Sequence, residues 1–178
     1  MNIPIPSNEK RRLEVLWKYD VLDTPPDASL DDLTELAASI CQTPIAMVSL
    51  VDQERQWFKA RVGLALTETP RDISFCTHAI LQPDVMVVRD ALLDPRFKSS
   101  PLVTGDPYIR FYAGAPLTTS EGLALGTLCV ADRVPRVLDS KQSEALRKLA
   151  RVIVQFLELR RQVKELSAVP IRQRSSVS

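Results

Sequence analysis

Residues Ile109 to Leu149 decide the fold, and they read IRFYAGAPLTTSEGLALGTLCVADRVPRVLDSKQSEALRKL. Two apolar runs, Phe111 to Leu117 and Leu125 to Val130, flank a short polar connection, and a long helical pattern follows them. Strands joined this tightly pair antiparallel, because a parallel pair needs a crossover of a dozen or more residues. We therefore predict an α+β fold in which a helix returns onto an antiparallel sheet. The segment contains no arrangement of catalytic residues, which favours a sensing or binding function.

The overall composition is typical of one globular domain. The chain has 178 residues, of which 45% are hydrophobic and 25% are charged, and its net charge is +1. A charge so close to zero creates no field that attracts nucleic acid or a membrane surface, so neither is expected as a partner. From Lys141 onward the chain carries nine Lys or Arg and three Glu. We interpret this basic surplus as a solvated helix face rather than a lipid or nucleic-acid site.

Several observations favour a cytoplasmic location. No apolar run approaches the ~20 residues that a membrane span needs. The N-terminus lacks the basic start and apolar core of a secretory signal. Cys41, Cys76 and Cys129 lie far apart and without paired spacing. Their spacing argues against a disulfide framework and against a zinc site, so no metal is expected.

The first third of the chain predicts two helices followed by two strands. A helix is expected over residues 8–20 with Ser7 as its N-cap, and a second helix is expected to be capped by Ser29. The run from Ile45 to Val51 is almost entirely apolar, as in a central strand that is buried on both faces. Residues 57–62 alternate in polarity, which predicts a half-exposed strand beside it.

The middle of the chain is less regular. Residues 64–73 contain breaks and are read as irregular, residues 74–81 as a short helix capped by Ser74, and residues 85–88 as a short strand. Residues 90–107 are rich in Pro, Asp and Ser but retain several apolar side chains. A long loop of this kind usually has a function, so we interpret it as a lid over a pocket.

The final helix, predicted over residues 140–166, has two apolar stripes. The first stripe contains Leu146, Ala150, Ile153 and Leu157 and lies on a different side of the helix from the second. The other repeats in alternating steps of four and three residues, like the seam of a coiled coil: Ala145, Leu149, Val152, Phe156, Leu159, Val163 and Leu166. One stripe is expected to cover the sheet. The seam, from Leu149 to Leu166, is the predicted homodimer interface, and intramolecular burial of both stripes is the alternative.

Three blocks of sequence resemble the GAF domains of bacterial signalling proteins, which lie at the input end of sensor kinases and diguanylate cyclases. The blocks are RDISFCTHAI (71–80), DALLDPRF (90–97) and FYAGAPL (111–117), the last continuing into GTLCVAD (126–132) and Pro135–Arg136. The resemblance covers residues 8–166, leaving an N-terminal extension of residues 1–7 and a tail of residues 167–178 that is expected to be disordered. It implies a central antiparallel sheet of five to six strands. The N- and C-terminal helices would cover one face, and the lid and short helices the other.

The same resemblance implies a small-molecule pocket under the lid. The residues expected to line it are Arg71, Phe75, Cys76, His78, Asp90, Phe97, Tyr108, Arg110 and Tyr112. Arginine can hold an anion and tyrosine can stack or donate a hydrogen bond, so an anionic or aromatic ligand fits best. The alternatives are ion pairs, Arg71–Asp90 or Arg96–Asp94, that pin the lid, and for His78 a hydrogen bond to the lid in place of sensing or iron ligation.

The cofactor is not identified by the sequence. Family members that attach a bilin use a Cys directly followed by His, and Cys76-Thr77-His78 departs from that pattern, so neither bilin nor haem is expected. The resemblance implies a non-enzymatic sensor without catalytic residues, which binds a small molecule, forms a homodimer and regulates an output. That output would be a histidine kinase of a two-component system or a cyclase. The alternatives are a free methionine-sulfoxide reductase of the GAF type and an interaction module without a pocket.

Overall fold

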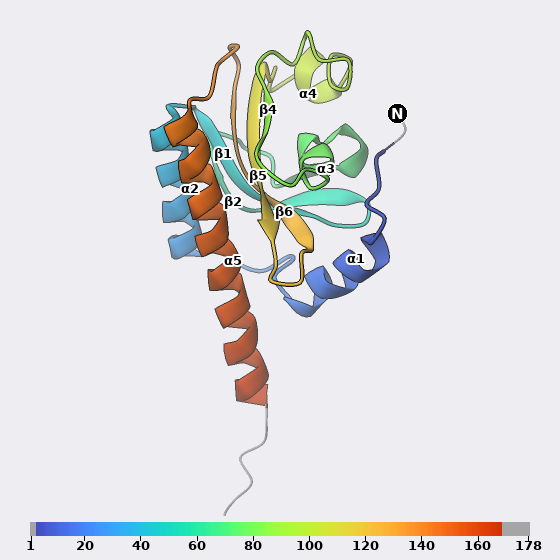
Figure 1. The fold of residues 1–178 in the computed structure, drawn as a ribbon, viewed down its shortest axis with the longest axis vertical. Helices are drawn as coiled ribbons and strands as arrows, with labels where there is room; N and C mark the ends of the chain where they lie inside the picture. Colours follow the sequence, from blue (N-terminus) through green and yellow to red (C-terminus); the bar gives the residue numbers. More distant parts are fainter. Residues whose placement is uncertain (1–2, 169–178) are drawn as a thin grey trace, which may run out of the picture.

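The computed structural model describes residues 3–168, which form one sheet with helices on both sides (Figure 1). The helices are α1 (Glu9–Lys18), α2 (Ala28–Cys41), the 3₁₀ helix η1 (Arg71–Ile73), α3 (Phe75–Ala79), α4 (Pro101–Thr104) and α5 (Ser140–Ala168). The strands are β1 (Ile45–Val51), β2 (Arg55–Val62), β3 (Glu68–Pro70), β4 (Met86–Val88), β5 (Phe111–Thr118) and β6 (Ala124–Asp132).

The sheet confirms the predicted α+β class. Its six strands lie in the order β3-β2-β1-β6-β5-β4, and every neighbouring pair is antiparallel. β5 and β6 pair as the hairpin predicted from their short connection. β1 lies near the middle and is buried along its whole length, as its continuous apolar sequence predicts. β3 was missed, because three residues with a proline give no strand pattern.

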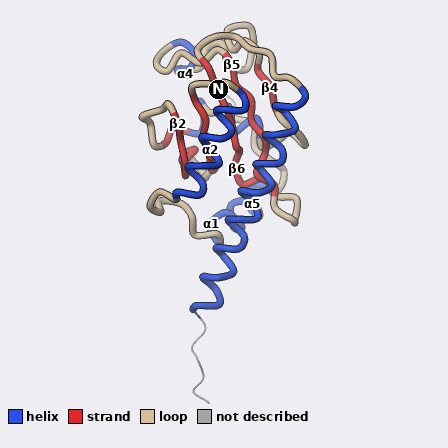
Figure 2. The backbone as a smooth tube through the Cα atoms, turned by 90° about the vertical axis from the view of Figure 1, so that its left-hand side faces the viewer, coloured by secondary structure: helices blue, strands red, loops and turns tan. Residues whose placement is uncertain are grey.

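Two apolar cores lie on opposite faces of the sheet. Alternate side chains of β1 contribute to both: Ala46, Val48 and Leu50 to the core under α2 and α5, and Ile45, Met47 and Val51 to the core under α3 and the lid. Figures 1 and 2 show α2 and α5 side by side on one face. α1 also contributes to the core of α2 and α5, but it packs at the end of the sheet against β6.

The helix caps differ from two predictions. Asp27, not Ser29, caps α2, because its extended backbone lets its carboxylate accept hydrogen bonds from the Ser29 and Leu30 N–H groups at 3.0 and 3.3 Å. α1 begins after Asn8, and neither Asn8 nor the predicted Ser7 provides a side-chain cap. The predicted cap of α3 is correct, since Ser74 accepts a hydrogen bond from the Thr77 N–H at 3.2 Å.

The prediction that β2 is half exposed was wrong. Its register with β1 shifts between Val48 and Ser49, so Lys59 has no direct partner on β1 and the alternation of faces is interrupted. Lys59 is consequently buried, although its Nζ keeps two hydrogen bonds, to Thr24 Oγ1 at 2.7 Å and to the Pro25 carbonyl oxygen at 2.6 Å. Burial lowers the pKa of this lysine.

α5 buries one of its two predicted stripes. Leu146, Ala150, Ile153 and Leu157 are the buried residues of the helix, and they pack on the sheet face. The helix continues to Ala168, so residues 167 and 168 of the predicted tail are helical, and residues 169–178 lie outside the described part. Figures 1 and 2 show the C-terminal half of α5 extending beyond the sheet.

Candidate functional site

The lid face of the sheet is filled mainly by a stack of aromatic rings. Phe75 of α3 lies between Phe97 of the lid and Tyr112 of β5, with ring centroids 4.2 and 5.0 Å away. The cavity left beside this stack measures about 30 Å³. A single water needs roughly 10–15 Å³ measured in this way, so a metabolite enters only if the stack opens.

A cluster of sulfur and hydroxyl groups lies behind the stack. The Sγ atoms of Cys76 and Cys129 are 3.8 Å apart, and both residues are buried. Thr127 Oγ1 and Tyr112 Oη donate hydrogen bonds to the Cys76 sulfur at 3.1 and 3.3 Å. Cys129 Sγ also lies 3.7 Å from the Met47 carbonyl oxygen. The two thiols therefore share a small polar site in an otherwise apolar core.

Burial and hydrogen bonding act in opposite directions on Cys76. Burial by itself raises the pKa of the Cys76 thiol, but hydrogen bonds from Cys129, Thr127 and Tyr112 outweigh it and lower the pKa. The contact with Cys76, together with burial, raises the pKa of Cys129 well above its usual value. Within the pair, Cys76 is the sulfur that loses its proton first.

A buried polar network holds α3 in this position. Ser74, the cap of α3, donates from Oγ to Gln56 Oε1 at 2.7 Å, and Gln56 Nε2 donates to Thr69 Oγ1 at 2.6 Å. Ser49 Oγ of β1 contacts the same Gln56 oxygen at 3.3 Å. The network links α3 to β1, β2 and β3, and because its members are buried and bonded, it fixes Cys76 relative to the sheet.

A second hollow, of about 280 Å³, lies on the outer side of α3. Arg71, His78 and Phe97 contribute to its wall, together with Arg96 and the N-terminal residues 3–4. The His78 ring meets Phe97 edge to face at 4.8 Å between centroids. Burial, and then the charge of Arg96, lower the pKa of His78, so the neutral imidazole is favoured. The wall of this outer groove contains the guanidinium groups of Arg71 and Arg96 together with Asp72, and the two arginines pair with Glu9 and Asp94, respectively.

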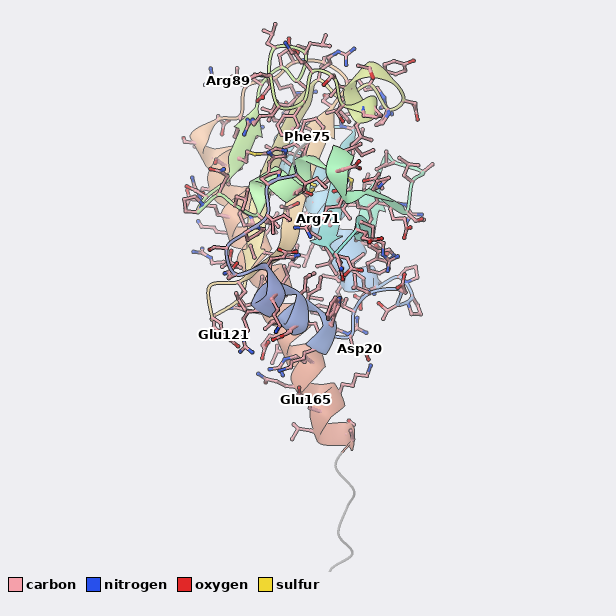
Figure 3. All side chains as sticks on the ribbon, turned by 90° about the vertical axis from the view of Figure 1, so that its right-hand side faces the viewer. Asp20, Arg71, Phe75, Arg89, Glu121 and Glu165 are labelled. Atoms are coloured by element: carbon pink, nitrogen blue, oxygen red, sulfur yellow. The ribbon has the colours of Figure 1, made fainter. Side chains whose placement is uncertain are left out.

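Arg71 connects the outer groove to α1. Its side chain is 5% exposed, and Nη1 donates to Glu9 Oε1 at 2.6 Å and to the Asp52 carbonyl oxygen at 3.1 Å. Nε and Nη2 of Arg71 are buried and have no partner among the described residues. Figure 3 shows Arg71 between α1 and Phe75. Glu9 also receives two hydrogen bonds of 2.8 Å from Arg12, so one carboxylate joins two buried guanidinium groups.

The predicted ligand residues fall into three groups. Phe75, Cys76 and Tyr112 line the inner cavity, and Arg71, His78 and Phe97 line the outer groove. The remaining residues, Asp90, Tyr108 and Arg110, line neither hollow.

These remaining residues have other positions. Asp90 accepts a hydrogen bond from the Leu92 N–H at 3.0 Å within the lid, and Tyr108 is exposed. Arg110 donates to the carbonyl oxygens of Val103 and Ile109, so it braces the lid. Of the two alternative ion pairs, Arg96–Asp94 is present at 2.7 Å, whereas Arg71 pairs with Glu9 and not with Asp90.

Two residues of the thiol site were not among the predicted site residues. Cys129 was interpreted as plain core, and it is fully buried, but it also touches Cys76. Thr127 was not considered. Its signal was visible in the sequence, because a lone threonine interrupts the apolar run of β6 and must find a buried hydrogen-bond partner. Ser49 interrupts β1 in the same way.

Comparison with known proteins identifies the family. A model of the GAF domain matches residues 25–160. The chain belongs to the GAF domain family. A cyclic di-GMP phosphodiesterase of Pseudomonas aeruginosa is 46% identical over 152 residues, which are 85% of this chain and 26% of that protein. This GAF domain therefore spans about a quarter of the length of the curated relative that it matches.

Solved structures of low identity show the same fold. The GAF domain of an Acinetobacter phosphoenolpyruvate-protein phosphotransferase superimposes with a TM-score of 0.64 at 14% identity, covering 87% of this chain and 98% of that one. A free methionine-R-sulfoxide reductase of Neisseria meningitidis gives a TM-score of 0.62 at 20% identity, covering 92% and 98%. At such identities the likeness concerns the fold alone.

The expectation that the chain is non-enzymatic is contradicted by the comparison with known proteins. The relative at 46% identity is named as a phosphodiesterase, so this GAF domain is related to part of an enzyme.

Two further observations concern the described residues only. None of their helices is both long and apolar enough to cross a membrane. No group of three His, Cys, Asp or Glu side chains among them is placed to hold a metal ion.

Proposed function

We propose that this GAF domain is the homodimeric regulatory module of a protein that acts in cyclic di-GMP signalling. The relation to a cyclic di-GMP phosphodiesterase supports the choice of output. In this proposal the lid side receives the signal and α5 carries it to an output domain. That output domain would be a cyclic di-GMP phosphodiesterase, in place of the histidine kinase or diguanylate cyclase expected from the resemblance. The cysteine spacing remains in keeping with a cytoplasmic location.

The observation that carries the proposal is the apolar seam of α5. Val152, Leu159, Val163 and Leu166 are 45%, 61%, 63% and 74% exposed. Their spacing is that of a coiled coil, and a helix with this pattern is complementary to a second copy of itself. The other two predicted interface residues, Leu149 and Phe156, are partly buried against their own core. They would form the end of the interface that lies nearer the sheet.

The proposed input is a small anionic molecule bound in the outer groove. Arg71 offers two buried N–H-bearing nitrogen atoms without a partner among the described residues, and Arg96, which pairs with Asp94, adds a second guanidinium group to the wall. A bound carboxylate or phosphate would satisfy such groups. Binding shifts a conformational equilibrium only if the ligand prefers one conformation. Phe97 belongs to both the outer groove and the aromatic stack, so it connects a bound ligand to the stack.

The dimer is tested by measuring mass in solution. Sedimentation of the wild type across a range of concentrations should show a dimer, and Leu159→Asp should give a monomer because it places a charge in the seam. Leu93→Asp is the matched control, since Leu93 is 80% exposed on the lid and should leave the dimer intact. A wild type that stays monomeric at high concentration, or a Leu159→Asp variant that remains dimeric, would refute the proposal.

A second candidate is an interaction module that binds no small molecule. The interlocked rings of Phe75, Phe97 and Tyr112 and the cavity of about 30 Å³ favour it. Native mass spectrometry of purified protein separates the two candidates. A bound metabolite that is lost in Arg71→Met supports the sensor with a ligand, whereas bare protein under all loading conditions supports the interaction module.

A further inference from the structure

We infer that Cys76 and Cys129 form a reversible oxidation site, in which a small hydroperoxide converts the buried thiol pair into a disulfide. The site lies on the lid face of the sheet, away from the seam of α5. The inference does not depend on the proposed dimer, because it requires only the two sulfurs, their hydrogen-bond donors and a path for the oxidant.

The first argument is the position of the two sulfurs. They lie 3.8 Å apart, and a disulfide bond needs about 2.05 Å, so the sulfurs must approach by less than 2 Å. Cys76 belongs to the short helix α3 and Cys129 to the central strand β6. Because the buried network of Ser74 and Gln56 holds α3 and pairing on both sides holds β6, we expect rotation of the two cysteine side chains about their Cα–Cβ bonds to supply most of this approach.

The second argument is the polar surrounding of Cys76. Thr127 Oγ1 and Tyr112 Oη point their hydroxyl groups at its sulfur, and the Cys129 sulfur lies 3.8 Å away. Hydrogen bonds of this kind stabilise the thiolate, which is the nucleophilic form of cysteine. Cys41 provides the contrast, because it lies in the other core and its burial raises its pKa to about 11.

The third argument is access. Cys76 lines the cavity of about 30 Å³, and the same cavity is lined by Leu66, whose side chain is exposed at the surface. Its walls are apolar apart from four residues, namely Gln56, Thr69, Cys76 and Tyr112. A space of one or two water molecules admits hydrogen peroxide, but it excludes an aromatic hydroperoxide or free methionine sulfoxide unless the stack opens.

The chemistry balances without a further reactant. The Cys76 thiolate attacks one peroxide oxygen, so an S–O bond forms, the O–O bond breaks, and the leaving hydroxide takes up a proton to become water. Cys129 then attacks the sulfur of the resulting sulfenic acid. An S–S bond forms, the S–O bond breaks, and the departing oxygen leaves as a second water with the proton of the Cys129 thiol. The two thiols lose two electrons, and the peroxide gains them.

The test is oxidation of the folded, fully reduced protein with hydrogen peroxide, followed by blocking of free thiols and peptide mapping. We expect one Cys76–Cys129 disulfide per chain, loss of two titratable thiols, and full recovery with dithiothreitol. Cys41→Ser should oxidise at the wild-type rate. In Cys129→Ser the reaction should stop at a sulfenic acid on Cys76, seen as one added oxygen atom in the mass of the intact protein. Cumene hydroperoxide should react much more slowly than hydrogen peroxide.

Two results would overturn the inference. One is a wild type whose Cys76 and Cys129 stay reduced at a peroxide concentration that oxidises Cys41. The other is a disulfide that forms only after the protein is unfolded in urea, since the native contact would then be irrelevant. Tyr112→Phe is a second variant that retains both thiols. It removes one donor from the Cys76 sulfur, so it should slow the first step several-fold at neutral pH while circular dichroism stays native.

Discussion

Replacing Glu9 by glutamine should destabilise the domain by about 3 kcal/mol at neutral pH. Burial by itself would raise the pKa of Glu9, but hydrogen bonds and charges from Arg12 and Arg71 outweigh it and lower the pKa from 4.5 to about 2. Each pKa unit corresponds to about 1.4 kcal/mol, which gives the stated magnitude. The loss has a plain structural cause, because Glu9→Gln leaves two buried guanidinium groups without their carboxylate.

The sign of the pH dependence follows from the lowered pKa. Stability from an acid whose pKa is depressed on folding is complete above its unfolded pKa and is lost as the pH falls through the folded one. The difference in unfolding free energy between wild type and Glu9→Gln should therefore shrink to about 1.4 kcal/mol at pH 3. Urea unfolding followed by circular dichroism at pH 7 and pH 3 measures both values.

The control for this experiment is Glu121→Gln. Glu121 also pairs with an arginine, Arg11 at 2.9 Å, but both side chains are more than half exposed. An exposed pair contributes about 0–1 kcal/mol, so this variant should remain close to the wild type at either pH. If Glu9→Gln behaves like Glu121→Gln, or if its deficit does not shrink in acid, then the buried carboxylate does not stabilise the fold as described.

Two further predictions concern local structure, and both are measured by urea unfolding. Asp27→Ala should cost about 1–2 kcal/mol, because α2 loses its cap and Arg160 loses its partner. Ser29→Ala should change stability by less than about 0.5 kcal/mol. The reverse order would favour Ser29 as the cap, as expected from the sequence. Gly126→Ala should cost about 3 kcal/mol or more, because a Cβ there would lie 1.9 Å from a carbonyl oxygen of β1. Gly122→Ala, in an open turn with a φ of +78°, should cost only about 1 kcal/mol, and equal losses would exclude the close approach as the cause.

The elements that were predicted correctly are those determined by local pattern. The nearly continuous apolar run of β1, the short β5–β6 connection and the Ser74 cap each need only neighbouring residues to be recognised. The buried stripe of α5 is of the same kind, since its spacing alone separates it from the seam. These features explain why the family resemblance and the α+β class could be stated before the structure.

The candidate site was less predictable, because its residues meet only through the fold. Cys76 and Cys129 are 53 positions apart, and nothing in either sequence neighbourhood indicates that their sulfurs touch. Lys59 was placed on the exposed face because a register shift between two strands leaves no mark in a polarity pattern. Likewise, the partner of Arg71 proved to be Glu9, at the start of the chain, rather than the nearer Asp90.

The contacts of α5 change in kind along its length, so its two halves are held to the rest of the domain unequally. Up to Leu157 it is fixed by buried apolar side chains. Beyond that point, ion pairs such as Arg160–Asp27 and Lys164–Asp20 tie it to the α1–α2 region. Both side chains of the Lys164–Asp20 pair are exposed, and such a pair contributes about 0–1 kcal/mol, whereas the Asp27 side chain is largely buried. The last eleven residues to Ala168, roughly 16 Å of helix, contain neither Gly nor Pro and therefore follow the buried part of α5 as a rigid extension. A small displacement of the sheet would be magnified at the far end of this arm.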